Sequence, residues 1–582
     1  MTPRVIGRSF VHSGVARDKT RGTEAVVIHE TLYYEDGKTE PNLRVFNNPE
    51  ISFWVTKPQF RNHTDKKERE ELAKLDQYIC KTSELEREVF KVLNGYYPKG
   101  HVSRDQILSS PFIYGVGIDI QTRIKARYRD DFEKTGLTPA PATVGFLDIE
   151  RSLLESNLNE ITIINYTHEN KLYTAILENS FYHMDDNGNR RKATVEDVEK
   201  LSTETLNPII DRMFTENEDL STVKGKLPID VTYYVGKTEL DLITWIFDRI
   251  HENKTAFVGI WNMDFDVPAI IDVIERNDKD PADFFCPPSL QPAFKSARYK
   301  KDKKQGAHLT DKWHWMFSTG WTQFYDATPL YAKLRVVKGK EARYTLDYIL
   351  QINNIDGKLK FHHLKGVENL SGADWHRKMS SRYFLEYVVY GQYDVLGLQF
   401  LEWQNRDVQS MILLSDVTPV AKFPRQTVKV QDTLHTDWIK KGWVLGTPSS
   451  DMTEDYDEEI SADGGAVLSA LRMDRNGLFA IRECPKLRTQ LHCFVNDVDF
   501  SGMYPNTAQA ANISKETKVS TALNIVSPTV QQYFQPVEAV EAFFGYLACP
   551  HANAYTIGKQ FFSFPTFDEL EETFEREVLS QL

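Results

Sequence analysis

Two acidic residues, Asp148 and Glu150, follow the apolar run of residues 144–147 and are the first candidates for chemistry. If this run is a β-strand, residues two apart point to the same face, so the two carboxylates lie side by side. Adjacent carboxylates repel each other, and a fold tolerates them most readily where a hard cation such as Mg²⁺ takes oxygen ligands. The pattern predicts either a metal site or, as the plainer alternative, the solvated end of a strand.

A third acidic residue, Asp266, comes shortly after a second apolar run at residues 256–261. A helix predicted to start near Thr238 precedes this run, so the order of elements indicates an α/β unit. Strands in α/β sheets deliver their C-terminal ends to ligand sites, which favours a functional role for Asp266. The alternative is that Asp266 caps the next helix, with Pro268 near the first turn of that helix.

Tyr390 and Asp394 form the next candidate pair, on a helix predicted over residues 382–401. Residues four apart share one face of a helix. Apolar neighbours on both sides of the pair anchor the rest of this helix in a core. Such a pair is either catalytic or held together by a local hydrogen bond, and the pair alone does not separate the two interpretations.

Taken together, these signals resemble the three exonuclease motifs in the proofreading domain of family B DNA polymerases. The motifs are Asp148-x-Glu150, then Asn262-x-x-Phe265-Asp266, then Tyr390-x-x-x-Asp394. The resemblance covers about residues 141–405, and Tyr325-Asp326 and residues 344–347 look like the connecting segments of the family. It implies a ribonuclease H-like domain with 3′→5′ exonuclease activity.

The resemblance implies two Mg²⁺ or Mn²⁺ ions in this site, with Asp148, Glu150 and Asp394 on the first and Asp148 with Asp266 on the second. Two such ions stabilise the attacking and leaving oxygens of a displacement at phosphorus. Tyr390 would orient the attacking water. Asn262 and Phe265 would contact the single-stranded 3′ end of DNA. The expected products are a nucleoside monophosphate and a shortened 3′ end.

A second site is implied by the segment Asp499-Phe500-Ser501-Gly502-Met503-Tyr504-Pro505, which resembles the first palm motif of the same polymerases. Residues 512–517 strengthen the likeness to T-even-type phage enzymes. In this register Asp499 would bridge two catalytic metal ions and Tyr504 would exclude a 2′-hydroxyl. The backbone of Phe500, Ser501, Gly502 and Met503 would cradle the triphosphate of a dNTP.

Two features leave alternatives open in this second motif. Gly502 stands where the family usually has Ser, and Asp497 shares a strand face with Asp499, which allows a register shifted by two residues. We favour Asp499 because the Tyr504-Pro505 spacing fixes it. A strand-to-helix turn without metal, with Pro505 at the first helical position, is the structural alternative.

No Asp-Thr-Asp palm motif and no finger-helix motif follow Tyr504. Two-metal phosphoryl transfer needs at least two carboxylates, so we expect the chain to polymerise only with a second chain that carries fingers, remaining palm and thumb. We therefore interpret the chain as the N-terminal part of a split family B polymerase that acts on primer-template DNA, with a sliding clamp as a further partner. The alternatives are a free-standing exonuclease with a vestigial palm and a non-catalytic DNA-binding scaffold.

The overall charge does not point to nucleic acid, because the 582 residues carry a formal net charge of -13. Phosphate responds to local charge, however, and a basic run at residues 295–304 is interleaved with Tyr299 and followed by Trp313 and Trp315. Within it, Lys300 and Lys301 are predicted DNA contacts. The alternative is a solvated loop.

The length predicts several domains. We expect α/β and α+β domains: a mixed N-terminal domain (1–140), the ribonuclease H-like exonuclease (141–405), a segment that returns to the N-terminal domain (406–470) and a partial polymerase palm (471–582). Residues 180–230 are interpreted as a long polar insertion in the exonuclease. The five cysteines form no Cys-x-x-Cys pair, which argues against a zinc site. With no apolar membrane span and no signal peptide, we expect a cytoplasmic protein.

Overall fold

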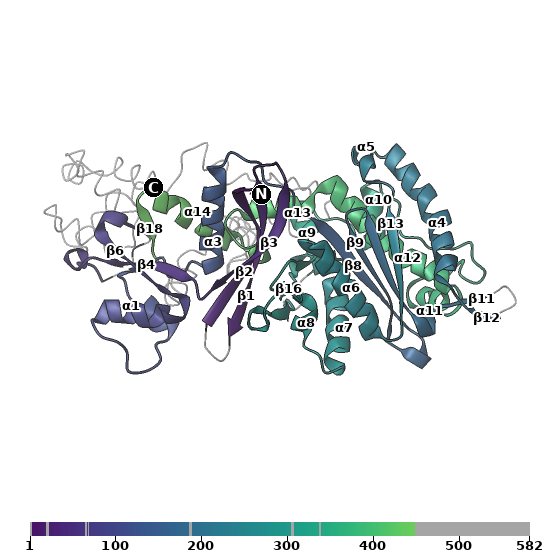
Figure 1. Cartoon of the computed structure of the whole chain (residues 1–582), viewed down its shortest axis with the longest axis horizontal. Coiled ribbons are helices and arrows are strands. Elements are labelled where there is room, and N and C mark those ends of the chain that lie inside the picture. Colours follow the sequence, from purple (N-terminus) through teal and green to yellow (C-terminus); the bar gives the residue numbers. More distant parts are fainter. Residues whose placement is uncertain are drawn as a thin grey trace, which may run out of the picture. The chain divides into compact units, whose positions relative to one another are not determined.

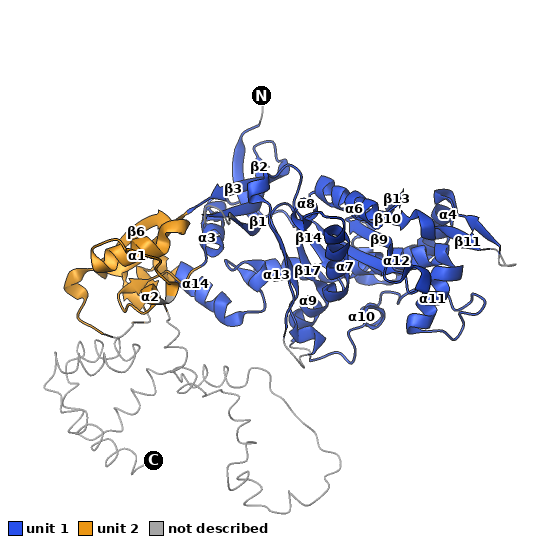
Figure 2. Ribbon diagram, turned by 90° about the horizontal axis from the view of Figure 1, so that it is seen from below, with its two compact units in different colours: residues 1–49, 119–436 blue, residues 50–118, 437–582 orange. Residues whose placement is uncertain are grey.

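A computed structural model of the chain describes residues 3–18, 23–64, 67, 69–184, 189–303, 308–336 and 339–447 (Figure 1). The predicted palm motif lies outside the described residues, and with it Asp499, Phe500, Ser501, Gly502, Met503 and Tyr504. The chain divides into two compact units, Met1–Pro49 with Asp119–Thr436, and Glu50–Ile118 with Asp437–Leu582 (Figure 2). Our boundaries at residues 140 and 405 fall inside the first unit and stay predictions.

A mixed sheet of eight strands forms the centre of the first unit. In spatial order the strands are β13 (Asp230–Gly236), β10 (Lys171–Leu177), β9 (Ile161–His168), β8 (Val144–Arg151), β14 (Phe257–Ile260), β17 (Gln323–Asp326), β16 (Trp315–Ser318) and β15 (Ala297–Lys300). β8, β14 and β17 run parallel to one another, whereas β9 is antiparallel to both β8 and β10. The expected α/β character of this region is therefore confirmed.

Helices cover both faces of this sheet (Figure 1). On one face α12 (Phe384–Asn405) packs on β8 and β9, and α4 (Val195–Glu216) packs on α12. On the other, α6 (Glu239–Asn253) packs on β9, β10 and β13, beside α7 (Met263–Arg276). Along β8, Phe146 joins the α12 core, while Leu147 and Ile149 join the α6 and α7 core. Because strand side chains alternate, Asp148 and Glu150 must face α12.

The start of α6 shows why the local sequence determines an element boundary. Thr238 and Asp241 form a reciprocal capping box, in which the Asp241 N–H donates to Thr238 Oγ1 at 3.2 Å and the Thr238 N–H donates to Asp241 Oδ2 at 3.0 Å. Leu242, Ile246 and Ile250 are fully buried below it. The predicted helix after Thr238 is thus confirmed, with its apolar stripe on the sheet.

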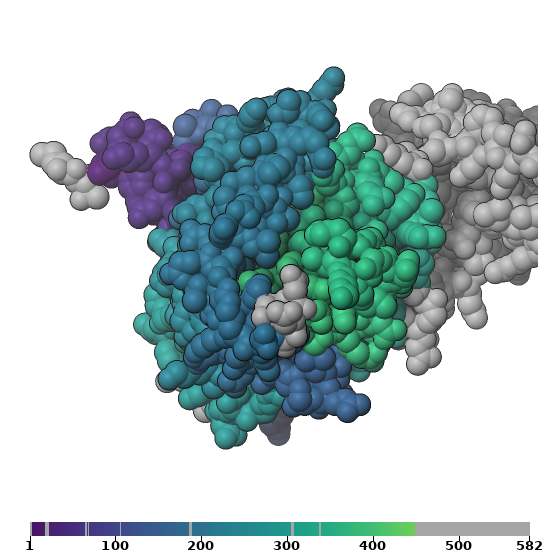
Figure 3. Space-filling model, turned by 90° about the vertical axis from the view of Figure 1, so that its right-hand side faces the viewer, coloured from purple at the N-terminus to yellow at the C-terminus, as the bar shows by residue number. Residues whose placement is uncertain are grey.

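Residues 180–230, which we expected to be a polar insertion, contain an ordered helical segment. The hairpin of β11 (Tyr182–Met184) and β12 (Arg190–Lys192) leads into the 22-residue helix α4, followed by α5 (Glu218–Ser221). Leu206, Ile210 and Phe214 of α4 are buried in the α12 core. On the face shown in Figure 3, the blue-teal surface that includes α4 borders the green surface that includes α11 (Gly372–Arg382).

The N-terminal strands β1 (Val5–Asp18), β2 (Thr23–Tyr34) and β3 (Thr39–Asn47) form a separate antiparallel sheet, packed against α3 (Ile120–Glu133). After α12 the chain continues through α13 (Asp407–Ser415) and α14 (Gln426–Lys440). It contacts α3 there, with Arg129 Nη1 3.0 Å from Asp416 and Lys125 Nζ 2.9 Å from the Thr418 carbonyl. Asp416 and Thr418 therefore contact α3, and the predicted return segment over residues 406–470 stays a prediction.

The second unit is built on small sheets. β6 (Leu75–Lys81), β4 (Glu50–Thr56) and β7 (Ile113–Tyr114) form one, and β5 (Arg69–Glu71) pairs with β18 (Trp443–Leu445). Its helices are α1 (Leu85–Asn94) and α2 (Arg104–Leu108); short helices in the first unit are α8 (Pro281–Phe285), α9 (Ala327–Leu334) and α10 (Leu346–Ile352). Within the described ranges, every helix is too short or too polar to cross a bilayer.

Candidate metal centre

Three of the predicted acidic residues meet between β8 and α12. Asp148, Glu150 and Asp394 each present a carboxylate oxygen, and these oxygens all lie within 4.8 Å of one another. Glu150 and Asp394 are 7% and 3% exposed, and Asp148 is half-buried. Carboxylate oxygens at these distances, in a largely buried position, are able to hold a metal ion.

The close approach of α12 to the sheet depends on a glycine. A Cβ atom placed on Gly391 would lie 2.7 Å from Asn165 Nδ2 of β9 and 3.5 Å from Cγ of Glu150. A side chain at this position would therefore push the helix away from both strands. Since Gly391 lies between Tyr390 and Asp394 on α12, it allows the helical carboxylate to reach the two carboxylates of β8.

Asp266 lies beside this group rather than within it. Its Oδ1 accepts a 3.4 Å hydrogen bond from the Ile149 N–H, and its side chain is 2% exposed. α7 begins at Met263, after Asn262 in the left-handed conformation (φ 66°), so Asp266 lies inside the helix. The N-cap alternative for Asp266 is therefore wrong, because the left-handed Asn262 already occupies the capping position.

Lys358 is a residue of this site that the sequence did not reveal. Its Nζ donates to Asp394 Oδ2 at 2.5 Å and to the Tyr390 hydroxyl at 2.8 Å. The backbone N–H of Lys358 donates to Asp347 Oδ1 at 2.8 Å, which holds the loop between α10 and α11 in place. Lys358 lies in a loop, so neither the helical nor the strand periodicity of the sequence could predict its place in the site. The shared lysine also shows that Tyr390 and Asp394 use the same helix face, as predicted.

Tyr387 and His376 form a second layer behind Glu150. The Tyr387 hydroxyl donates to Glu150 Oε2, and His376 Nδ1 lies 2.9 Å from the Tyr387 oxygen and 3.8 Å from the same carboxylate oxygen. Tyr387 precedes Asp394 by seven residues, so the spacing of 387, 390 and 394 could have predicted one continuous polar stripe on this helix. His376, on α11, had no comparable signal.

Burial and mutual repulsion raise the pKa values of these acids. Burial and then the neighbouring Asp394 raise the pKa of Asp148 to about 7, against the opposing charge of Lys358. Burial raises the pKa values of Glu150 and Asp266 well above their ordinary range, with Asp148 as the next cause in both. Burial likewise raises the pKa of Asp394, although Lys358 opposes it. The charge of Lys358 therefore only partly offsets the effects of burial and repulsion in this group.

Two observations indicate that the residues fit a divalent cation. Four carboxylates carry up to four negative charges, and Lys358 is the one cation hydrogen-bonded to them in the described part of the chain. In addition, Asp394 Oδ1 is buried and accepts no hydrogen bond from any described residue. An unsatisfied buried carboxylate oxygen is costly unless a cation or a donor binds it. The donor set consists entirely of carboxylate oxygens, which hard cations such as Mg²⁺ and Mn²⁺ prefer.

A further buried acid, Asp326, lies at the end of β17. Burial raises its pKa to about 8, and Asp326 Oδ1 accepts a 3.2 Å hydrogen bond from the Thr328 N–H at the start of α9. Its charge also contributes to the raised pKa of Asp266. Asp326 thus caps α9 and also lies next to the acidic group. Its position at the end of an apolar strand is the sequence feature that could have predicted a place in the site.

The residues predicted to contact DNA lie on the surface near the start of α7. Asn262 is exposed and Phe265 is 49% exposed, with the Arg151 guanidinium 5.2 Å from the centre of the Phe265 ring. Lys301 forms a 2.7 Å ion pair with Asp264, which brings it to the same helix turn. Lys300 is exposed at the end of β15. Arg151, directly after Glu150, was not predicted.

No family model matches the chain, and a comparison with curated proteins gives no match either.

Proposed function

We propose that this chain is a metal-dependent 3′→5′ exonuclease that removes nucleotides from single-stranded 3′ ends of DNA. The observation that carries this proposal is the meeting of Asp148 and Glu150 from β8 with Asp394 from α12, beside the buried Asp266. The order of the three sequence motifs that supply these residues supports the proposal as well. A solvated strand end would not need three carboxylates within 4.8 Å of one another, two of them buried.

Under this proposal, Asp148, Glu150 and Asp394 would hold one Mg²⁺ or Mn²⁺, and Asp148 with Asp266 would hold a second. When bound, the ions supply an acidified water and neutralise charge that develops on the phosphate oxygens. Mg²⁺ is favoured because every available donor is a carboxylate oxygen.

The chain's own residues supply orientation and fixed charge. The Tyr390 hydroxyl accepts a hydrogen bond from Lys358 Nζ and lies beside Asp394, where it could orient a water or a phosphate oxygen. Lys358 supplies a partly buried positive charge close to where negative charge would develop on the phosphate oxygens. The half-exposed Phe265 ring offers a surface for a base at the 3′ end, and Lys300 and Lys301 would attract the phosphates that follow.

We further propose that this sheet is a ribonuclease H-like fold. The strand order β10-β9-β8-β14-β17 supports this, with β9 antiparallel to its two neighbours and the others parallel. In this order the catalytic strand β8 is central, and its carboxylates emerge beside the C-terminal end of β14, where ligand sites of α/β sheets collect.

The wider proposal is that the chain is the N-terminal part of a family B DNA polymerase. It depends on the sequence around Asp499, which would bind dNTP and metal, and on a second chain that completes the polymerase site. Primer-template DNA and a sliding clamp are the remaining proposed partners. Primer extension by this chain, with and without a chain that carries the missing palm and finger motifs, tests this wider proposal.

The exonuclease itself is tested with the full chain, Mg²⁺ and an oligonucleotide labelled at its 5′ end. We expect a ladder of products shortened from the 3′ end, no digestion in EDTA, and a loss of at least about 10³-fold in Asp148→Ala, which removes a bridging ligand. Asp283→Ala is the matched control, because Asp283 is an exposed surface acid paired with Lys295. Undiminished digestion by Asp148→Ala would refute the site assignment.

A further inference from the structure

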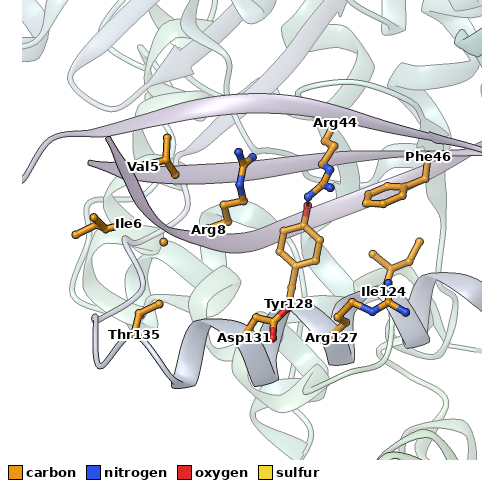
Figure 4. A pocket seen from close by; sticks show the side chains of 11 residues that line it. Val5, Ile6, Arg8, Arg44, Phe46, Ile124, Arg127, Tyr128, Asp131 and Thr135 are labelled. Atoms are coloured by element: carbon orange, nitrogen blue, oxygen red, sulfur yellow. Dashed lines mark hydrogen bonds between the residues drawn. The ribbon is translucent and has the colours of Figure 1, made fainter. Parts of the chain in front are cut away.

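A pocket separate from the metal centre lies between the N-terminal sheet and α3. It has a volume of about 400 Å³ and is open to solvent. Figure 4 shows that strand side chains line one side and α3 side chains the other, among them Arg8, Arg44 and Phe46 opposite Arg127 and Tyr128. The volume lies within the range of small-molecule sites.

Two lining residues, Arg8 and Tyr128, are held by hydrogen bonds to the buried Glu30. Glu30 is completely buried, and its Oε1 accepts from Arg8 at 2.5 Å and from Asn42 at 2.7 Å. The Tyr128 hydroxyl donates to Glu30 Oε2 at 2.7 Å and accepts from Arg44 Nη1 at 3.4 Å. These bonds neutralise Arg8 and fix the positions of the Tyr128 and Arg44 side chains, so this part of the pocket is preorganised.

The remaining charge in the pocket is positive. Arg44 and Arg127 are exposed and form no ion pair with any described residue. Asp131, the one acid in the lining, is paired with Lys134 at 2.8 Å. Two guanidinium groups without acidic partners, one on β3 and one on α3, therefore face the same cavity. Guanidinium groups suit phosphate because of their fixed, forked donors.

An apolar surface adjoins these cations. The Arg44 guanidinium lies 4.7 Å from the centre of the half-buried Phe46 ring, and Ile6, 46% exposed, lines the same cavity. A planar guanidinium stacked on a ring provides a platform on which a further planar group can stack. The ligand that uses both features carries a phosphate and a flat ring, as a nucleotide does.

We propose that this pocket binds one nucleotide, either free or as a unit of a single strand, with its phosphate between Arg44 and Arg127 and its base against Phe46. This site is independent of the proposed exonuclease, because none of its residues belongs to the acidic group between β8 and α12. It gives a strongly acidic chain a local surface for an anionic partner.

The test measures binding in EDTA with the full chain carrying Asp394→Asn, so that the exonuclease does not contribute cleavage. The probes are a fluorescent oligothymidylate, followed by anisotropy, and dAMP and inorganic phosphate, followed by calorimetry. We expect Arg44→Gln with Arg127→Gln to weaken oligothymidylate binding at least about tenfold. The slope of log affinity against log salt concentration should fall by the contribution of about one phosphate contact. Arg17→Gln, a charge change on the N-terminal sheet at an exposed arginine that lies outside the lining, as does its partner Glu24, should have no effect.

The arms of the experiment separate the two sources of the ligand. Binding of dAMP that is lost in the double variant assigns a free nucleotide, and loss confined to the oligothymidylate assigns a unit of a strand. Affinity within twofold of the parent for every probe would overturn the proposal, and so would equal affinity for phosphate and dAMP, which would exclude a contribution from the base. Melting temperatures confirm folding, and the single variant Arg127→Gln replaces the double variant should the latter unfold. Because the read-out is binding, failure here leaves the exonuclease test unaffected.

Discussion

Replacing Asp148 with Asn should stabilise the metal-free protein at pH 8 and abolish the proposed exonuclease activity. The pKa of Asp148 rises from an ordinary 3.8 to about 7, because of burial and then the charge of Asp394. Between these two values the native state binds more protons than the unfolded state, so stability falls as the pH rises through this window. The full difference corresponds to about 4 kcal/mol, and the part that lies between pH 5 and pH 8 corresponds to about 3 kcal/mol, both as upper limits.

The assay is urea unfolding in EDTA at pH 5 and pH 8, followed by intrinsic fluorescence. The stability advantage of Asp148→Asn over the wild type should widen by up to about 3 kcal/mol between the two pH values, because Asn carries no charge in either state. Asp283→Asn is the control, since Asp283 is a surface acid outside the group, and its stability relative to wild type should stay constant within about 0.5 kcal/mol.

Metal provides the reverse test. At pH 8 added Mg²⁺ should stabilise the wild type more than at pH 5, because binding must displace the protons that these acids hold at low pH. Asp148→Asn should lose this response. A stability difference between variant and wild type that does not change with pH would refute the argument that the carboxylates meet in a buried, cation-deficient group.

Two further substitutions test the residues that support the acids. Lys358→Gln should lower kcat/KM at least about 100-fold, since it removes the positive charge that contacts Asp394. Its control is Lys360→Gln, a substitution at a half-exposed neighbour, which should retain activity. Equal activity of the two variants would contradict a specific role of Lys358. Tyr387→Phe should raise the Mg²⁺ concentration for half-maximal activity about tenfold, because Glu150 loses a hydrogen bond that orients it. Tyr393→Phe is its control, as this hydroxyl donates to the Asp356 carbonyl, and an unchanged Mg²⁺ requirement in Tyr387→Phe would remove Tyr387 from the site.

The sequence predicted the residues whose positions depend on regular periods. Asp148 and Glu150 share a strand face because strand side chains alternate, and Tyr390 and Asp394 share a helix face because they are four residues apart. Once the two elements pack together, the meeting of these residues follows. The capping box at Thr238 was predictable for the same reason, since its two hydrogen bonds are local.

The residues that were missed depend on tertiary contacts. Lys358 reaches Asp394 from a loop, so no period marked it. α4 was interpreted as polar because its buried residues, such as Leu206 and Phe214, are spaced among many charged ones. Asp266 was left with two roles, because the sequence did not reveal that Asn262 adopts a left-handed conformation and starts the helix earlier. The left-handed backbone of Asn262 therefore determines that Asp266 lies inside α7 rather than at its N-cap.

Lys358 explains how a chain can bring four acids together before any metal binds. A buried group of carboxylates without a cation would remain protonated or push the strand and helix apart. Lys358 satisfies one oxygen of Asp394 and leaves the other, Oδ1, without a donor in the described structure. The two oxygens of one carboxylate can thus serve different purposes. Oδ2 anchors the loop between α10 and α11 to α12, and Oδ1 stays available to a divalent ion. A neutral residue in place of Lys358 would therefore weaken both the metal-free fold and the active state, whereas loss of Asp148 weakens only the active state.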